Sequence, residues 1–231
     1  MSTVDDLKQE ICAAADQLVK IGIMTKSNHG NISIKVPDRD AFVMTSGGGL
    51  ANMTPDNIAL FDLHGGLIEG NVAPVGGEII QMHAIVYRTR PEFQSVIHTH
   101  SPFATGFAVA GKVIPQAYEA LVRNGMIEGV PLAGYGPRGS DQSVRNIETQ
   151  LKAHDKVKGV LLENHGVLCF ADNVNGAIRA NMTIEESAEI IMYSYNLGGP
   201  KALPSNEIEA TRERAAQFAA AGSYSSEQNR T

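Results

Sequence analysis

The stretch Ser95–His100, which reads SVIHTH, constrains the fold of this chain more than any other feature. Two β-branched residues lead into two histidines, which is typical of a short strand. Alternate side chains of a strand point to the same face, with a rise of about 3.3 Å per residue. His98 and His100 would then lie side by side, with Cα atoms about 6.6 Å apart. Two imidazoles at that separation can bind one ion, or they can be two hydrogen-bonded histidines of a core.

The periodicity of apolar residues predicts a chain that mixes helices and strands. Helices are expected over residues 4–21, 141–153, 174–196 and 205–221, with further helices beginning near Glu78 and at Ser101. Strands are expected at 32–36, 41–45, 57–63, 67–70 and 95–100. Two more fall within 158–170, joined by a tight turn at His165 and Gly166. No linker is visible, so one domain is expected over 1–231, with 223–231 a disordered tail.

Charge and hydropathy exclude two classes of partner. The net charge of −6 argues against nucleic acid, whose phosphates require a basic stripe. The sequence has no run of about 18 apolar residues, so no membrane span is expected. Cys12 and Cys169 lie among apolar residues, which favours buried free thiols and a cytoplasmic location.

Two further features bear groups that could act with the paired histidines. His165 lies between two apolar runs that read as central strands, and a polar triplet there must face a cavity or a ligand. Glu78 follows Gly76 and Gly77 at the start of a helix, where the helix dipole stabilises a carboxylate. Three imidazoles and a carboxylate would suffice to hold Zn²⁺ with one position left for substrate. Spacing alone does not prove that they meet.

A polar glycine loop follows the predicted strand 41–45. Its sequence is Ser46-Gly47-Gly48-Gly49. Backbone N–H groups of such a loop can bind an anion, although a plain flexible turn explains the composition equally well.

Taken together, these motifs resemble the class II aldolase/adducin family over residues 4–200. The matching segments occur in the family's order: Gly30-Asn31-Ile32-Ser33, Thr45-Ser46-Gly47, Glu78 before a helix, His98-Thr99-His100-Ser101, and Asn164-His165-Gly166. The resemblance implies a three-layer α/β/α sandwich with a mainly antiparallel central sheet. It also implies a homotetramer with active sites at the subunit interfaces.

The resemblance assigns roles to residues position by position. It implies that His98, His100 and His165 are metal ligands. Glu78 would be the catalytic acid/base and would also ligate the ion in the absence of substrate. The substrate contacts that it implies, with Asn31 donating to a substrate oxygen, are Asn28, Gly30, Asn31, Ser46, Gly47, Gly76 and Gly77.

Three departures from the family pattern concern the substrate. Phosphate-using members carry serines where this chain has Gly76 and Gly77, so two hydroxyl donors are lost while backbone N–H groups remain. The family's sugar-phosphate aldolase has a tyrosine that reaches the site across the subunit interface. At that position this chain has Glu119, and Tyr118 could take the role after a one-residue shift. Arg138 stands where an aromatic residue is expected, and it could bind a carboxylate bidentately or form a loop salt bridge.

The sequence therefore predicts a metal-dependent lyase with no Schiff-base lysine. The metal is expected to be Zn²⁺, with Mn²⁺ or Co²⁺ as other choices. It would make or cleave a C–C bond in a small sugar, sugar-phosphate or sugar-acid substrate through a metal-stabilised enediolate. One alternative keeps the metal site but decarboxylates a hydroxy-acid or epimerises a sugar phosphate. A remote alternative is a non-catalytic, adducin-like interaction domain.

Overall fold

A computed structural model describes residues 2–47, 49–73, 77 and 79–221. The helices are α1 (Val4–Ile21), α3 (Ile80–Thr89), α4 (Pro102–Val109), α5 (Glu119–Arg123), α6 (Asp141–Ala153), α7 (Val174–Tyr195) and α8 (Ser205–Ala221). The strands are β1 (Gly30–Lys35), β2 (Ala41–Thr45), β3 (Ile58–Asp62), β4 (Leu67–Glu69), β5 (Ser95–Thr99), β6 (Leu132–Ala133), β7 (Gly159–Leu162) and β8 (Gly166–Ala171).

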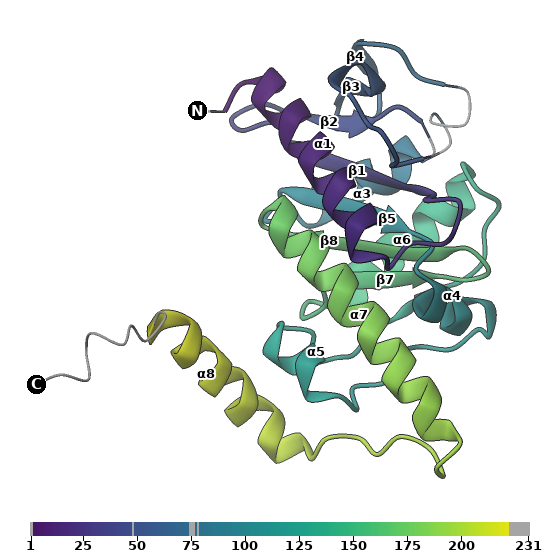
Figure 1. Ribbon diagram of the computed structural model, residues 1–231, viewed down its shortest axis with the longest axis vertical. Coiled ribbons are helices and arrows are strands. Elements are labelled where there is room, and N and C mark those ends of the chain that lie inside the picture. Colours follow the sequence, from purple (N-terminus) through teal and green to yellow (C-terminus); the bar gives the residue numbers. More distant parts are fainter. Residues whose placement is uncertain (1, 48, 74–76, 78, 222–231) are drawn as a thin grey trace, which may run out of the picture.

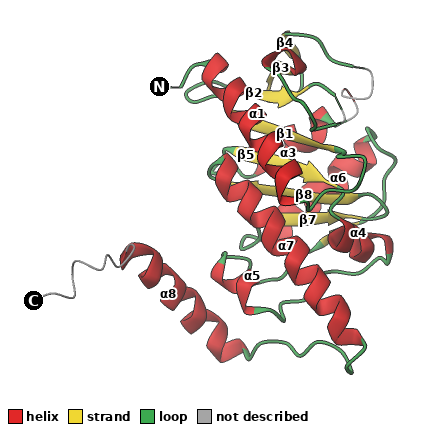
Figure 2. Cartoon of the chain, viewed as in Figure 1, coloured by secondary structure: helices red, strands yellow, loops and turns green. Residues whose placement is uncertain are grey.

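The strands form one sheet in the order β4-β3-β2-β1-β5-β8-β7-β6 (Figure 2). All neighbouring pairs are antiparallel except β6 and β7. The prediction of a mainly antiparallel sheet is therefore confirmed. Strand β5 lies between β1 and β8, where His98 is paired with Asn31 on one side and with Leu168 on the other. The sequence SVIHTH thus occupies the centre of the sheet.

Helices cover both faces of the sheet (Figure 1), which confirms the predicted three layers. Alternation along β5 divides its side chains between the faces. Val96 packs in a cluster with residues of α3 and α6, whereas Ile97 packs with residues of α1 and α7. A third cluster joins α4, α5 and α7 on the same side as Ile97. His98 and His100 follow the alternation of Val96, and Thr99 follows that of Ile97.

The two ends of helix α1 are determined by residues next to them in the sequence. Thr3 accepts a hydrogen bond from the Asp6 backbone N–H, and the Asp6 carboxylate accepts one in return from the Thr3 N–H. This capping box satisfies donors that the first turn leaves free. Gly22 ends the helix at φ +78°, a left-handed conformation that costs glycine little.

The C-terminal part departs from the layered body. Helix α8 extends away from the sheet in Figure 1. The helical periodicity of residues 174–196 predicts an inward position for Met192. Met192 is instead 39% exposed, because the last turns of α7 run past the sheet (Figure 1). The predicted tail 223–231 lies outside the described residues. Within the described part of the chain, no helix is long and apolar enough to cross a membrane.

Candidate metal centre

His98 is held by the backbone of the neighbouring strand. Its side chain is fully buried, and its Nδ1 lies 3.0 Å from the carbonyl oxygen of Val167. Because a carbonyl only accepts, Nδ1 carries the proton and Nε2 presents a lone pair. The Nε2 atoms of His98 and His100 are both buried, and neither has a hydrogen-bond partner among the described residues. A buried lone pair without a partner is the arrangement that a metal ligand requires.

His165 reaches the same place from the turn between β7 and β8. The turn covers Glu163–His165, not His165 and Gly166 as predicted, because Asn164 takes the left-handed conformation at φ +57°. Asparagine tolerates that conformation better than most residues, so Gly166 is free to begin β8. Antiparallel pairing of β5 with β8 then brings the turn beside the end of the histidine strand.

Gly166 allows the close approach of these two elements. A Cβ atom built at Gly166 would lie 2.6 Å from the Thr99 carbonyl oxygen and 2.9 Å from Cδ2 of His100. Any side chain would therefore push the turn away from the histidine strand. The glycine has a steric role next to the site that its position in a motif did not reveal.

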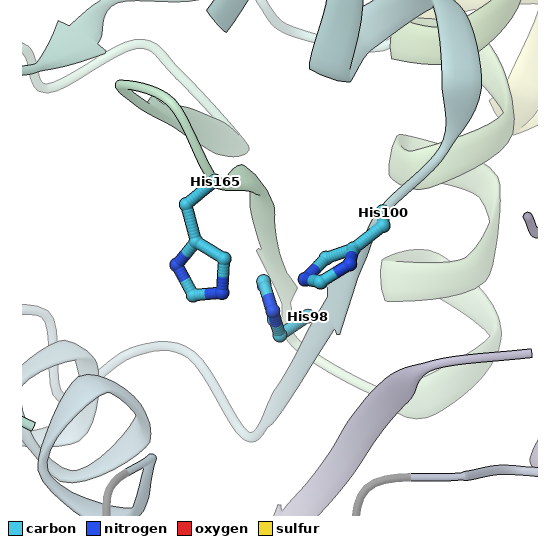
Figure 3. A group of neighbouring side chains, drawn as sticks. All are labelled: His98, His100 and His165. Carbon is cyan, nitrogen blue, oxygen red and sulfur yellow. The ribbon is translucent and has the colours of Figure 1, made fainter. Parts of the chain in front are cut away.

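The three imidazoles form one cluster (Figure 3). Ring centroids are 4.7 Å apart for His98 and His165, and 5.0 Å apart for the two pairs that include His100. One candidate ligand atom from each residue lies within 4.8 Å of the other two. Two unpartnered Nε2 atoms and a third imidazole fit a divalent metal such as Zn²⁺, which commonly takes three histidines and one exchangeable ligand.

The environment keeps the three imidazoles neutral, as metal binding requires. Burial, with the neighbouring His165 and His100, holds the pKa of His98 well below its usual range. Burial also lowers the pKa of His100 to about 4, with His165, His29 and Arg138 adding to the effect. The pKa of His165 falls to about 4 through burial and the charge of Arg138. At neutral pH the lone pairs are thus available without loss of a proton.

These shifts predict that the metal-free protein loses stability in mild acid. His83, which is fully buried on α3, has its pKa lowered by burial to about 3. The pKa of His29 is lowered as well, so five buried or half-buried histidines are affected. In the unfolded chain a histidine binds a proton below about pH 6.5. The unfolded state therefore binds more protons between pH 6.5 and 4. The free energy of unfolding should fall by about 1.4 kcal/mol per pH unit for His83 alone.

Urea unfolding with a chelator at pH 7, 6 and 5 measures this effect. The urea midpoint should decrease at each step, with the larger decrease between pH 6 and 5. A midpoint that stays constant from pH 7 to 5 would contradict neutral buried histidines.

The two polar segments expected to bind an anion do lie together. The Asn31 amide nitrogen donates to the Gly47 carbonyl at 2.7 Å, and Leu50 N–H donates to the Asn28 carbonyl at 3.0 Å. Gly30 is paired with Thr99 of the histidine strand, and a Cβ atom there would lie 2.7 Å from the His98 carbonyl oxygen. The loops therefore border the metal centre.

Ser46 and Asn31 differ in the polar atoms that they leave available to a ligand. The Ser46 hydroxyl donates to the Asn57 carbonyl at 3.0 Å, so its proton is already engaged. The Asn31 Oδ1 is buried and has no partner among the described residues, while its nitrogen holds Gly47. Gly77 is exposed. Gly76 and Glu78 lie outside the described residues.

His29 was missed by the sequence analysis. Its ring lies 4.8 Å from that of His100, tilted by 37°. Burial and the charge of Arg138 lower its pKa. The charge of Arg138 also lowers the pKa of His100 and of His165, so it acts on all three rings. No residue spacing links His29 to the other histidines, and only the pairing of β1 with β5 brings it there.

Tyr118 and Glu119 are not brought to this centre within the chain. The Tyr118 hydroxyl donates to Glu186 of α7 at 3.1 Å, and Glu119 begins helix α5 with its side chain 59% exposed. No contact among the described residues connects either one to the histidines. Helix α5 lies on the α7 side of the sheet, the opposite side from the face that bears His98.

Comparison with known proteins finds a matching family and several similar enzymes. The model of the family described as "Class II Aldolase and Adducin N-terminal domain" matches residues 9–192. The chain is 31% identical over 204 residues to 5-deoxy-D-ribulose 1-phosphate aldolase of Bacillus thuringiensis, an alignment covering 87% of this chain and 92% of that protein. It is 27% identical to 5-methylthioribulose-1-phosphate/5-deoxyribulose-1-phosphate aldolase of Rhodospirillum rubrum, with 90% of each chain covered.

A solved structure extends the similarity to three dimensions. L-fuculose 1-phosphate aldolase superposes with a TM-score of 0.82 at 28% sequence identity. The superposition covers 93% of this chain and 97% of that one. The fold described above is thus the fold of that enzyme over nearly its whole length.

Proposed function

Because the chain belongs to the class II aldolase and adducin family, we infer that it is a metal-dependent aldolase-type lyase acting on a small sugar-like hydroxy-carbonyl compound. The observation that carries this inference is the cluster of His98, His100 and His165, in which two buried Nε2 atoms lack partners among the described residues. An adducin-like interaction domain would not need to keep such ligands. The non-catalytic alternative therefore has the least support.

The three histidines would hold the metal, which we propose to be Zn²⁺. Mn²⁺ and Co²⁺ are compatible with imidazole ligands too. When bound, the ion would act as a Lewis acid that stabilises negative charge on the substrate oxygens. The contribution of His98 is rigidity, because its Nδ1 hydrogen bond to Val167 fixes the orientation of the ring.

Proton transfer is assigned to Glu78. A carboxylate beside the cluster would accept a proton from the substrate hydroxyl during cleavage or return one to carbon. Its place in the sequence supports this role, since it directly precedes Ile79 and the α3 helix. Helix α3 packs on the face of the sheet that bears His98, and the charge of His83 on α3 affects the pKa of His98. Helix α3 thus lies on the same side of the sheet as the histidine cluster, which supports this role for Glu78.

We further propose that backbone groups bind the anionic end of the substrate. The relatives named above act on sugar 1-phosphates by their names. Here Ser46 has its hydroxyl proton engaged, and Gly76 and Gly77 offer no side-chain donors. The N–H groups of Asn28 and Ser46 donate to the carbonyls of Thr25 and Asn57, each at 2.8 Å. Other backbone N–H groups of these two segments would therefore bind the anion, with Asn28, Gly30 and Gly47 at its border. Asn31 would contact the substrate oxygen closest to the metal.

Arg138 favours a second reading of the substrate. Its positive charge lowers the pKa of three imidazoles, those of His29, His100 and His165. A guanidinium there can bind a carboxylate in a bidentate manner. That supports a hydroxy-acid substrate, and with it decarboxylation or epimerisation as the alternative reaction at the same metal centre.

Product analysis separates these reactions. The Zn²⁺-loaded protein is incubated with 5-deoxyribulose 1-phosphate, fuculose 1-phosphate and matched hydroxy-acids. We expect cleavage between C3 and C4 of a ketose 1-phosphate, which gives dihydroxyacetone phosphate and an aldehyde. Release of CO₂ from a hydroxy-acid without formation of an aldehyde would identify the protein as a decarboxylase and contradict the aldolase assignment. Interconversion of pentulose phosphates without cleavage would identify an epimerase.

The active unit is proposed to be a homotetramer. Large apolar side chains are exposed near the ends of α4 and α7, where they include Val109 at 60% and Leu197 at 88%. A hollow of about 270 Å³ lies beside them, lined by Gly106, Phe107, Ala110, Lys112, Met192 and Tyr195. Exposed apolar patches of this kind mark contacts between proteins. A neighbouring subunit could then bring Tyr118 or Glu119 to the site, and a monomeric mass in solution would contradict this assembly.

The cytoplasm is the proposed location. Cys12 and Cys169 are both free thiols, and Cys169 is buried. Free cysteines are typical of proteins in a reducing compartment.

A further inference from the structure

A closed group of three buried polar residues lies behind the histidine strand. Thr99, Ser101 and Asn181 are each fully buried. Thr99 stands between His98 and His100 in the sequence, but alternation along the strand turns its side chain to the opposite face. Asn181 belongs to helix α7, which covers that face. The group therefore cannot touch a metal, and any effect on the metal must pass through the backbone of residues 98–101.

The three side chains satisfy one another in a ring. The Asn181 amide nitrogen donates to the Thr99 hydroxyl at 2.8 Å, and the Ser101 hydroxyl donates to Asn181 Oδ1 at 3.3 Å. The Thr99 and Ser101 hydroxyls lie 2.8 Å apart. Since Ser101 gives its proton to Asn181, Thr99 must donate to Ser101. Each hydroxyl thus donates once and accepts once, so the ring is fully satisfied although it is buried.

One helical turn later, α7 makes a second attachment to the same segment. The two carboxylate oxygens of Glu185 accept hydrogen bonds from the N–H groups of Phe103 and Ala104, each at 2.8 Å. These N–H groups begin helix α4 and have no partner within the helix. The segment 99–104 is therefore fixed to one long helix at two successive turns, by Asn181 and by Glu185.

Burial of three polar side chains costs free energy that apolar residues would not cost, so packing alone does not explain the group. Around it are apolar residues of the α4 and α7 cluster and the Cys169 thiol, which lies 3.4 Å from the Asn181 nitrogen. Three buried polar side chains in this place require complete hydrogen bonding, whereas apolar residues of the same shape would not. The ring holds His98, Thr99 and His100 in a single backbone conformation.

We propose that Asn181 is a positioning residue for the metal, which holds the backbone of His98, Thr99 and His100 so that the two Nε2 atoms stay directed at one point. The proposal rests on the metal-dependent function inferred above. Its effect is preorganisation: without the ring, the strand end would sample conformations in which the two imidazoles diverge. Outer partners that orient metal ligands typically change metal affinity by about 10–100-fold when removed.

The test uses Asn181→Leu with Ser187→Ala as its matched control. Ser187 is also fully buried on α7, but its hydroxyl donates to the Thr183 carbonyl within the helix. Zn²⁺ affinity is measured by competition with a chromophoric chelator, and ligand geometry by the visible spectrum of the Co²⁺-loaded protein. Thermal unfolding of the metal-free proteins reports stability. We expect Asn181→Leu to bind Zn²⁺ about 10-fold or more weakly and to shift the Co²⁺ bands. Ser187→Ala should leave both unchanged.

A second pair of variants keeps the proposal testable if Asn181→Leu does not fold. Thr99→Val removes the hydroxyl with little change in shape and should weaken Zn²⁺ binding similarly. Thr99→Ser keeps the hydroxyl and should retain most of the wild-type affinity for Zn²⁺. Two results would overturn the role of Asn181 while leaving the metal site intact. One is wild-type Zn²⁺ affinity and Co²⁺ spectrum in both Asn181→Leu and Thr99→Val. The other is a loss of Zn²⁺ affinity in Ser187→Ala equal to that in Asn181→Leu. Absence of Zn²⁺ and Co²⁺ binding by the wild-type protein would overturn the metal site itself.

Discussion

His100→Ala is expected to abolish tight metal binding and to reduce turnover by roughly 10³-fold or more. His100 contributes one of the two buried Nε2 atoms that lack partners among the described residues. Two imidazoles bind a divalent ion far less tightly than three. Loss of a Lewis acid removes several kcal/mol of charge stabilisation, and each 1.36 kcal/mol corresponds to about a tenfold change in rate.

His29→Ala is the matched control for this variant. His29 is also half-buried, and its ring lies 4.8 Å from that of His100, yet it is not part of the group whose ligand atoms lie within 4.8 Å of one another. Metal content after dialysis, measured by mass spectrometry, should therefore stay at the wild-type level in His29→Ala and fall in His100→Ala. Equal metal content in the two variants would show that the described histidine cluster does not bind the ion.

Much of the local structure followed from the sequence because its causes are local. The twofold periodicity of a strand places His98 and His100 on one face whatever the rest of the chain does. Thr3 and Asp6 cap α1 through bonds that span three residues. These interactions can be recognised from composition and spacing within a short window.

The assembly of the site depends on contacts between distant segments, and periodicity does not encode them. His165 meets the other two histidines because β8 pairs with β5, and the family resemblance anticipated that meeting whereas spacing did not. The predicted turn wrongly included Gly166 and left out Glu163 and Asn164, since the sequence does not show that Asn164 adopts the left-handed conformation. The partner of Thr99 lies 82 residues away on α7, so the ring behind the strand left no sequence signal.

The substrate is the least predictable part for a related reason. Binding of an anion by backbone N–H groups depends on loop conformation, which side-chain identity does not specify. Ser46 donates to a carbonyl, and the charge of Arg138 lowers the pKa of His165. These two facts point in different directions about the charge of the substrate. From the sequence, Ser46 is expected to contact the substrate, and Arg138 could either bind a carboxylate or form a loop salt bridge.

Glu78→Gln is expected to retain the metal and still lose about 10²–10⁴-fold in turnover, the usual contribution of a general acid/base. Glutamine has nearly the same shape as glutamate but cannot accept the proton. Metal content, kcat and exchange of the proton on the substrate carbon with D₂O are measured together. Exchange should be lost in parallel with turnover, while metal content stays at the wild-type value.

This pattern differs from that of His100→Ala, in which metal and turnover disappear together. The two variants thus separate metal binding from proton transfer. Measurements of turnover alone often fail to do so, because the effects of residues within one centre are not additive. If Glu78→Gln turns over within about threefold of the wild-type rate, a different group moves the proton. Tyr118 or Glu119 of a neighbouring subunit would then be the residue to change, because Tyr118 is partly exposed and Glu119 is exposed on the side of the sheet opposite His98.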